Sequence, residues 1–276
     1  IDEAVSLAKE ADVIIAALGE SNSMNGEGAS RSDITIPGPQ KDLLKALEAT
    51  GKPIVLVLTT GRPLALSWEN ENIDAILNTW SQGDQAGHAI ADVLFGDVNP
   101  SAKLTTSFPR SVGQCPIYYN HKSTGRPHGD YEPYRRFTSC YIDVLNSPLY
   151  PFGYGLSYTT YEYSDVKLSS NTLKGDGMLT ASVTVTNTGK REGKEIVQLY
   201  IHDVCSASTR PVKELRGFQK ISLKPGESKD VIFTLSADDL KYYNHALEYV
   251  CEPGDFEVMI GSNSRDVETA KFTYVE

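Results

Sequence analysis

The sequence lacks a long apolar run, which membrane-spanning proteins require, and an excess of positive charge, which is typical of nucleic-acid-binding proteins. Its longest apolar runs, Val13–Leu18 and Ile54–Leu58, are far shorter than the roughly 20 residues of a membrane-spanning helix. Acidic residues outnumber basic ones by 36 to 26, which gives a formal net charge of −10 at pH 7. This balance provides no general attraction for phosphate backbones or anionic lipid. We therefore expect neither a nucleic-acid partner nor a membrane partner.

Cysteine is scarce as well. The chain has only four cysteines, and none belongs to a C-x-x-C pair: Cys115, Cys140, Cys205 and Cys251. We predict four unpaired thiols, because a chain of 276 residues can bury a core without disulfides. No group of His, Cys and Asp has metal-ligand spacing, and the G-x-S-x-G and G-x-G-x-x-G motifs are absent. We expect no metal and no cofactor.

The N-terminal residues Ile1–Val5 have neither a basic start nor an apolar signal core. We therefore expect no signal peptide in this chain, and a mature or excised piece rather than a complete precursor. Its length predicts one to two domains. A hydrophobic fraction of 40% and a charged fraction of 22% are ordinary for globular proteins and argue against disorder.

The first half of the sequence alternates between helical and strand-like segments. Apolar residues at helical spacing predict helices over residues 2–11, 40–49 and 85–95. Short apolar runs, typical of strands covered on both faces, predict strands over residues 13–18, 54–58 and 73–80. Strands and helices that alternate at this spacing predict a mostly parallel sheet built from β-α-β units.

The pattern changes near Gly96, where a long region rich in proline and aromatic residues begins. Such a region is usually functional or wraps another surface. From about Tyr161, alternating residues separated by turn signals predict an antiparallel β-sandwich, with its clearest strands over residues 179–186, 196–201, 213–221, 229–235 and 254–260. We place the boundary near Thr160, which gives an α/β domain at 1–160 and a β-sandwich at 161–276.

The segment Gly19–Asp33 is the most informative part of the chain for chemistry. It follows a predicted buried strand, at the edge where open α/β sheets bind ligands. It contains two carboxylates, Glu20 and Glu27, each preceded by glycine. Either one can act as a general acid or base if its surroundings tune it, although solvated loop charge is the commoner role of such residues.

Several motifs occur in a specific order. They are GEGASRSDI at Gly26–Ile34, TTGRP at Thr59–Pro63, FGDVNPSAKL at Phe95–Leu104, SFPR at Ser107–Arg110, YPFGYGLSYT at Tyr150–Thr159 and VTNTG at Val185–Gly189. This order resembles the C-terminal half of glycoside hydrolase family 3, the β-glucosidases and β-xylosidases, over essentially the whole chain. One departure is Ala102, where the family usually has glycine. The most similar group is that of the periplasmic bacterial β-glucosidases.

The resemblance implies a mostly parallel α/β sandwich, incomplete at its N-terminus, followed by a fibronectin-III-like antiparallel sandwich. It implies a retaining, exo-acting β-glycosidase that hydrolyses a β-linked oligosaccharide or glucoside, with a periplasmic or secreted parent protein. Family enzymes begin with a barrel domain that carries the nucleophilic aspartate, and this chain contains no such barrel. Since retaining glycosidases need two carboxyl groups, we expect the fragment alone to be inactive. The incomplete sheet also makes a homodimer possible.

Which glutamate is the acid/base is left open by the resemblance. Many relatives have their catalytic glutamate directly after the strand, which favours Glu20. The β-xylosidase-like relatives carry an E-G-A-D-R sequence that matches Glu27 and its neighbours, and a residue further along the loop reaches further toward a barrel. We favour Glu27 over Glu20 and expect Arg31 to bind substrate or to pair with Asp33.

Other candidates carry less weight. The family places the segment around Tyr118 and His121 beside the active site, so both are candidate substrate-binding residues. We expect a structural ion pair for Arg62, a core position for Trp80 and a packed or capping role for His88.

Two further interpretations compete with an enzyme. A non-catalytic carbohydrate-binding module would need exposed aromatic residues, for which Tyr242 and Tyr243 are the clearest candidates in the sandwich. The second competing interpretation is a structural module that supports an enzyme, and the β-sandwich is the part of the chain that would have this role.

Overall fold

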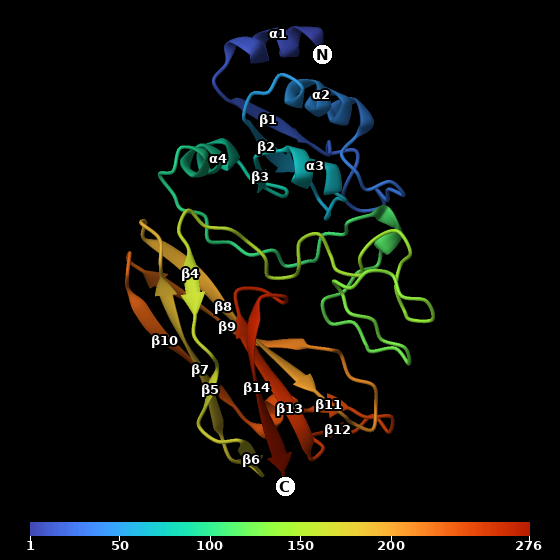
Figure 1. The fold of residues 1–276 in the computed structure, drawn as a ribbon, viewed down its shortest axis with the longest axis vertical. Coiled ribbons are helices and arrows are strands. Elements are labelled where there is room, and N and C mark those ends of the chain that lie inside the picture. Colours follow the sequence, from blue (N-terminus) through green and yellow to red (C-terminus); the bar gives the residue numbers. More distant parts are fainter.

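The computed structural model describes residues 1–276 and places the two predicted architectures at opposite ends of an elongated molecule (Figure 1). The α/β part lies at the N-terminal end, the β-sandwich lies at the C-terminal end, and an irregular segment runs between them. The predicted fold class, an α/β layer followed by a fibronectin-III-like sandwich, is confirmed.

The α/β part is built on a three-stranded parallel sheet in the order β1-β2-β3. Its strands are β1 (Ile14–Gly19), β2 (Ile54–Thr59) and β3 (Ala75–Asn78). The helices are α1 (Asp2–Glu10), α2 (Gly38–Glu48), α3 (Ser67–Asn72) and α4 (Ala86–Leu94). One face of this sheet packs against α2 and neighbouring loops to form an apolar core. The residues of this core include Ala16, Ile36, Leu44, Leu56 and Leu64.

The other face of this sheet corrects one expectation. The run at 13–18 predicted a strand covered on both faces, but Ile15 is 48% exposed and Ala17 is exposed too. On α4, no side chain is buried although the helix is apolar. An apolar run predicts a strand but not how many neighbouring elements the chain supplies to cover it. Burial on the second face was therefore wrongly predicted for β1, whereas Val57 of β2 is buried as predicted.

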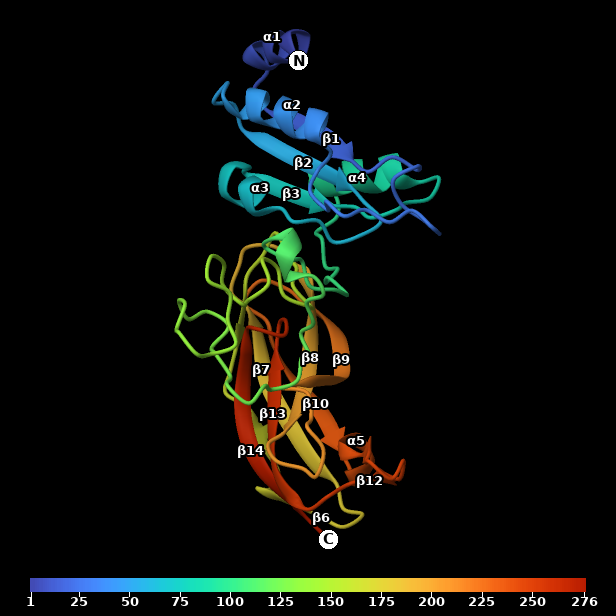
Figure 2. The ribbon, with the colours of Figure 1, turned by 90° about the vertical axis from the view of Figure 1, so that its right-hand side faces the viewer.

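The β-sandwich contains two main sheets around a core of 19 buried residues that include Val183, Val197, Leu223 and Val258. One sheet joins β10, β7 and β4, with β5 also paired to β7, and the other has the order β6-β14-β13-β8-β9. All of these pairs are antiparallel except β6 with β14. The bounds are β4 (Tyr161–Tyr163), β5 (Lys167–Leu168), β6 (Thr172–Lys174), β7 (Leu179–Asn187), β8 (Gly193–Asp203), β9 (Glu214–Leu223), β10 (Ser228–Leu235), α5 (Ala237–Leu240), β11 (Tyr242–Tyr243), β12 (Tyr249–Val250), β13 (Gly254–Gly261) and β14 (Val267–Val275). In Figure 2, β14, β13, β8 and β9 lie side by side below the parallel sheet.

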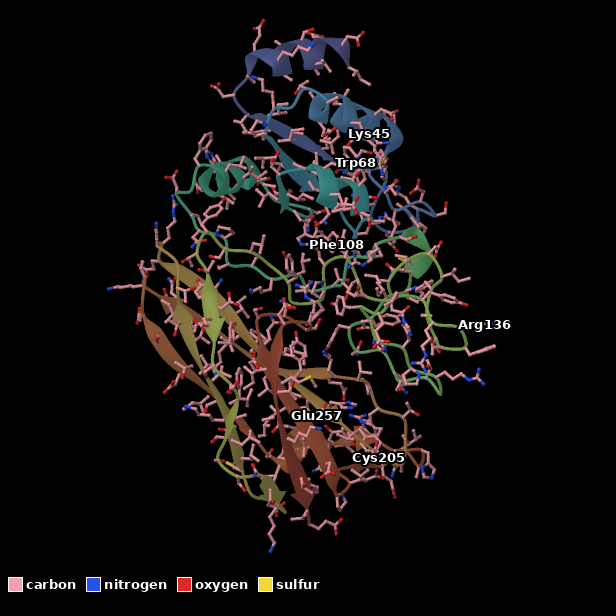
Figure 3. The ribbon with its side chains drawn as sticks, viewed as in Figure 1. Lys45, Trp68, Phe108, Arg136, Cys205 and Glu257 are labelled. Carbon is pink, nitrogen blue, oxygen red and sulfur yellow. The ribbon has the colours of Figure 1, made fainter.

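Residues 96–160 form the irregular segment, whose only helix is the 3₁₀ turn η1 (Val112–Gln114). Phe108, labelled in Figure 3, is buried within it. It contacts both Trp80 and Tyr150, at ring-centroid distances of 5.7 and 5.9 Å. On the sandwich side, Lys103 Nζ lies 3.0 Å from Glu195 Oε1. The segment thus packs against both architectures, as its irregular composition suggested.

The remaining local predictions had mixed outcomes. The three predicted helices and the eight predicted strands are present, but α3, β14 and several two- and three-residue strands were missed. Trp80 packs against the α/β core, and no cysteine forms a disulfide, as predicted. His88 was expected to have a packed or capping role, but it is exposed, and no residue of α4 is buried. No helix is long and apolar enough to cross a membrane.

The domain boundary near Thr160 stays a prediction that separate expression tests. We expect residues 161–276 to be monomeric and strongly protected from amide exchange, because both main sheets bury a face. Residues 1–160 should self-associate through the exposed apolar face around Ile15. Ile15→Ser should reduce light scattering by this piece. A monomeric 1–160 piece beside an unprotected 161–276 piece would contradict the expectation.

Candidate active site

The candidate site begins where β1 and β2 end side by side. These strands are parallel, with Gly19 opposite Thr59, so the segments that follow them leave from the same sheet edge. Gly19 has a φ of +144°, and a Cβ there would lie 1.8 Å from the Thr59 carbonyl oxygen. Only glycine allows the chain to pass so close to the Thr59 carbonyl group. This close approach places Glu20 against the turn that follows β2.

Glu20 is fully buried, with no part of its side chain exposed. Its Oε1 accepts a hydrogen bond from Arg31 Nη1 at 2.8 Å and lies 3.0 Å from Arg62 Nε. Its Oε2 accepts hydrogen bonds from Thr60 Oγ1 at 2.8 Å and from the Gly61 amide at 3.2 Å. The two arginines and the carboxylate form one ion-pair cluster, called here the Glu20 cluster.

The cluster controls the protonation of Glu20. Burial alone would raise the pKa of this carboxyl group. Hydrogen bonds from Arg31, Thr60 and the Gly61 amide, together with the charge of Arg62, outweigh burial and hold the pKa of Glu20 below its usual range. Glu20 is therefore ionised, and both of its carboxylate oxygens already have partners within the protein.

The two arginines also bond to the backbone of the loop that carries Glu27. Arg62 Nη2 donates to the carbonyl oxygens of Met24 and Ala29, at 2.5 and 2.9 Å. Arg31 Nη2 donates to the carbonyl oxygen of Thr35 at 3.0 Å. The ion pair expected for Arg62 is thus present, and it ties the loop to the turn after β2.

Glu27 lies at the exposed end of this loop. Its two neighbours, Gly26 and Gly28, have φ values of +105° and +73°, which side chains other than glycine rarely adopt. The Ala29 amide closes the turn by donating to the Gly26 carbonyl oxygen at 3.2 Å. No hydrogen bond or ion pair holds the Glu27 carboxylate itself, so it is free to meet a partner from outside.

The expected pair of Arg31 with Asp33 is not formed. Arg31 bonds to Glu20 instead, while Asp33 Oδ1 accepts a hydrogen bond from the Thr35 amide at 2.9 Å. Spacing along the sequence favoured the near neighbour Asp33, but the fold of the loop places the buried Glu20 carboxylate within hydrogen-bonding distance of Arg31. This backbone hydrogen bond is the main cause of a lowered pKa at Asp33.

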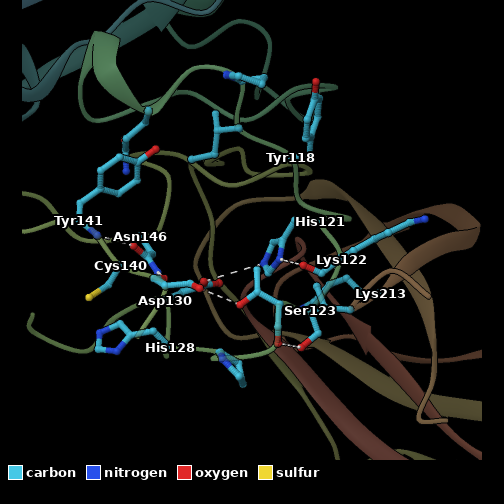
Figure 4. A pocket seen from close by; sticks show the side chains of 17 residues that line it. Tyr118, His121, Lys122, Ser123, His128, Asp130, Cys140, Tyr141, Asn146 and Lys213 are labelled. Carbon is cyan, nitrogen blue, oxygen red and sulfur yellow. Dashed lines mark hydrogen bonds and ion pairs between the residues drawn. The ribbon is translucent and has the colours of Figure 1, made fainter. Parts of the chain in front are cut away.

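Tyr118 and His121 line a pocket of about 690 Å³ in the irregular segment (Figure 4). Tyr118 is 60% exposed, and His121 Nε2 lies 4.0 Å from Asp130 Oδ1. Lys213 closes the pocket from the sandwich and donates to the Ser264 carbonyl oxygen at 2.6 Å. Burial lowers the pKa of Lys213, and the charges of Asp130 and Glu257 partly oppose this.

Sequence reasoning missed the contributions of Asp130 and Lys213 to this pocket. Lys213 lies about 90 residues from His121 along the chain, and only the packing of the segment on the sandwich brings them together. Neighbouring Tyr119 is not in the pocket, because it stacks on Phe152 at a ring-centroid distance of 4.2 Å. The loop at 20–33 and the loops around this pocket lie on the same side of the molecule (Figures 1 and 2).

The comparisons with known proteins agree with this architecture. A model of the "Glycosyl hydrolase family 3 C-terminal domain" matches residues 1–158, and a model of the "Fibronectin type III-like domain" matches residues 195–264. The chain belongs to glycosyl hydrolase family 3. The resemblance inferred from the motifs is therefore confirmed.

Individual members of family 3 match along nearly the whole chain. A periplasmic β-glucosidase of Salmonella typhimurium is 58% identical over 272 residues, covering 99% of this chain and 35% of that protein. A β-xylosidase of Formosa agariphila is 45% identical, covering 98% of this chain and 37% of that protein. The crystal structure of a β-glucosidase from Listeria innocua in complex with glucose superposes with a TM-score of 0.95 at 41% identity, covering 100% of this chain and 38% of that one. The chain thus spans little more than a third of these relatives.

The lowered pKa of Glu20 predicts how stability depends on pH. Ionised Glu20 stabilises the folded state above its unfolded pKa of about 4.3, and this contribution is lost as pH falls through the lower folded value. Glu20→Gln should therefore lower the free energy of unfolding by about 2 kcal/mol near neutral pH. Urea unfolding should show this difference shrinking below about pH 4. Glu10→Gln, on the exposed face of α1, should change little at any pH. A Glu20→Gln difference that grows on acidification would contradict the prediction.

Proposed function

We propose that this chain is the C-terminal portion of a retaining, exo-acting, β-glucosidase-like enzyme that hydrolyses O-glycosidic bonds. In this proposal Glu27 is the general acid/base, and the nucleophilic aspartate belongs to a barrel domain outside this chain. The relatives named as β-glucosidases and β-xylosidases support a glycosidase. The parent protein is proposed to be periplasmic or secreted, since a periplasmic β-glucosidase matches the chain closely.

The observation that carries the proposal is the contrast between the two glutamates. The Glu20 carboxylate is buried and forms hydrogen bonds or ion pairs with four neighbouring groups, those of Arg31, Thr60, Arg62 and the Gly61 amide. Glu27 projects from the same sheet edge with no partner in the chain. A general acid must reach the glycosidic oxygen of a substrate held by another domain, and Glu27 is the one with that reach.

The chemistry assigned to Glu27 has two steps. In the first, the aspartate attacks the anomeric carbon while Glu27 donates its proton to the departing glycosidic oxygen. In the second, Glu27 as a carboxylate takes a proton from water, whose oxygen displaces the aspartate from the anomeric carbon. This returns both carboxyl groups to their starting states. Retention requires the two groups to stand about 5–5.5 Å apart.

Arg31, Tyr118 and His121 remain proposed substrate-binding residues. Arg31 belongs to the Glu20 cluster but keeps 19% of its side chain exposed beside the loop. Tyr118 and His121 line the pocket on the same side of the molecule. An exposed tyrosine and a neighbouring imidazole can stack on a sugar ring and hydrogen-bond to its hydroxyl groups.

The assignment of Glu27 is tested in the intact enzyme that contains this chain. Glu27→Ala should slow substrates with poor leaving groups by about 10²- to 10⁴-fold, because those leaving groups need a proton. Activated aryl glycosides should be much less affected. Added azide should restore turnover and yield a β-glycosyl azide, since azide attacks the intermediate without a base. Glycosyl azide from Glu20→Ala but not from Glu27→Ala would move the assignment to Glu20.

The chain by itself provides the matching control. Without the nucleophile it should not hydrolyse an aryl β-glucoside above the level of a Glu20→Ala/Glu27→Ala double variant. Turnover above that level would show that the nucleophile lies within these 276 residues.

A second candidate function, carbohydrate binding by the sandwich, is favoured by one observation. Tyr243 and Tyr249 face each other on β11 and β12, with ring centroids 4.9 Å apart and 68% and 51% exposure. Of the two tyrosines that the sequence suggested, Tyr242 is instead buried. Two exposed rings on a short hairpin offer an apolar surface of the kind that sugar rings cover.

This binding function predicts that Tyr243→Ala and Tyr249→Ala each weaken retention of the chain by a soluble β-glucan at least several-fold. Affinity electrophoresis measures the effect. Phe218→Ala, at another exposed aromatic of the sandwich, is the matched control and should leave retention unchanged. Equal migration of the wild type and both tyrosine variants would exclude the hairpin as a glycan-binding surface.

A further inference from the structure

We infer that the Glu20 cluster positions Glu27 for proton transfer, which makes Glu20 and Arg62 positioning residues of the reaction. The inference rests on the proposed role of Glu27, and it assigns a function to the carboxylate that the acid/base role leaves unused.

Arg62 holds the Glu27 loop from both sides. The two carbonyl oxygens that its Nη2 atom contacts belong to Met24 and Ala29, three residues before and two residues after Glu27. Asn25 adds a packing contact, since a Cβ on Gly61 would lie 2.8 Å from Asn25 Cγ. The turn that follows β2 is thus the surface against which this part of the loop is fixed.

The loop has little else to fix it. Between Ser21 and Ala29, only two backbone hydrogen bonds form within the loop, from Met24 to Ser21 at 2.9 Å and from Ala29 to Gly26 at 3.2 Å. The glycines on either side of Glu27 have more conformational freedom than any other residue type. The direction in which Glu27 points therefore depends on the bonds from Arg62.

Glu20 in turn holds the arginines. It contacts Arg62 through Nε and Arg31 through Nη1, which leaves an Nη2 atom of each guanidinium directed at loop carbonyls. Because its side chain is completely buried, Glu20 acts on these arginines rather than on a substrate. Without its charge, two guanidinium groups would face each other across an unpaired site.

Proton transfer makes this arrangement matter for rate. A general acid must lie within about 2.6–3.2 Å of the atom it protonates. A misplacement of about 1 Å can cost about 10²-fold in rate. A loosened loop should therefore impair the steps that need the Glu27 proton and spare those that do not.

The test uses Arg62→Met in the intact enzyme, with two substrates that differ only in their leaving group. We expect kcat/KM for the poor leaving group to fall at least about 10-fold more than kcat/KM for the activated one. The alkaline limb of the pH–rate profile should remain, because Glu27 is still present, whereas Glu27→Ala should remove it. Arg62→Lys retains the charge and should show a smaller selective loss, because a compact ammonium group cannot span from the Glu20 carboxylate to the carbonyl oxygens of Met24 and Ala29 as the planar guanidinium does.

Lys103→Met is the matched control. It breaks another short, largely buried ion pair, that of Lys103 with Glu195 at 3.0 Å, which lies in the irregular segment and the sandwich. It should destabilise the protein without changing the ratio of the two kcat/KM values. An equal loss on both substrates in Arg62→Met, or the same selectivity in Lys103→Met, overturns the inference.

A second measurement uses this chain without any activity. Amide exchange over residues 21–31 should be faster in Arg62→Met and Glu20→Gln than in the wild type and in Lys103→Met. Unchanged exchange in the first two variants overturns the inference even if Glu27 is the acid/base. If instead Glu27→Ala shows no dependence on the leaving group, the proposed function fails, while faster exchange would still show that the cluster holds the loop.

Discussion

The buried carboxylate of Glu20, held between two arginines, is the interaction on which the candidate site depends. A charge taken out of water costs several kcal/mol unless partners replace its hydration. Here the partners are Arg31, Arg62, Thr60 and the Gly61 amide, which come from two segments that follow neighbouring parallel strands. The hydrogen bonds and ion pairs that compensate the Glu20 charge therefore join the loop after β1 to the turn after β2. The exposed Glu27 lies at the end of a loop whose base is fixed in this way.

The rest of the molecule provides a rigid frame around that edge. The β-sandwich has the larger core, and the irregular segment packs on it through the ion pair of Lys103 with Glu195 and the edge-to-face contact of Tyr119 with Tyr200. The same segment carries Phe108, which contacts Trp80 at the end of the parallel sheet. These contacts place the Tyr118 and His121 pocket and the Glu27 loop on one side of the molecule.

In the proposed enzyme, the two catalytic carboxyl groups come from different domains. The second face of β1, which carries Ile15 and Ala17, and the exposed Glu27 are both left uncovered by this chain. The matched family 3 proteins are nearly three times as long as this chain, with aligned regions of 35–38% of their length. In the proposed enzyme, one domain supplies the acid/base on a clamped loop and another supplies the nucleophile, so that the reaction depends on how the two are docked.

The sequence by itself determined the architecture and the family. Apolar runs and turn signals are local, so β1, β2, α2, α4 and the sandwich strands β7, β8, β9, β10 and β13 could be placed from the pattern alone, whereas β14 was missed. The ordered motifs were specific enough to identify family 3, and they drew attention to both Glu20 and Glu27. Local pattern could not tell these two glutamates apart, because each follows a glycine in the same polar loop.

Only the tertiary structure distinguished them. The partners of Glu20 lie up to 42 residues away, and the parallel register of β1 and β2 brings Thr60, Gly61 and Arg62 to its carboxylate. Arg31 pairs with Glu20 and not with its sequence neighbour Asp33, and the packing of the irregular segment on the sandwich brings Lys213 to the pocket of His121. Burial and ion pairing are properties of groups that are distant in sequence but adjacent in space. For that reason residue type and spacing suggested the candidates, and packing decided which carboxylate is occupied and which is free.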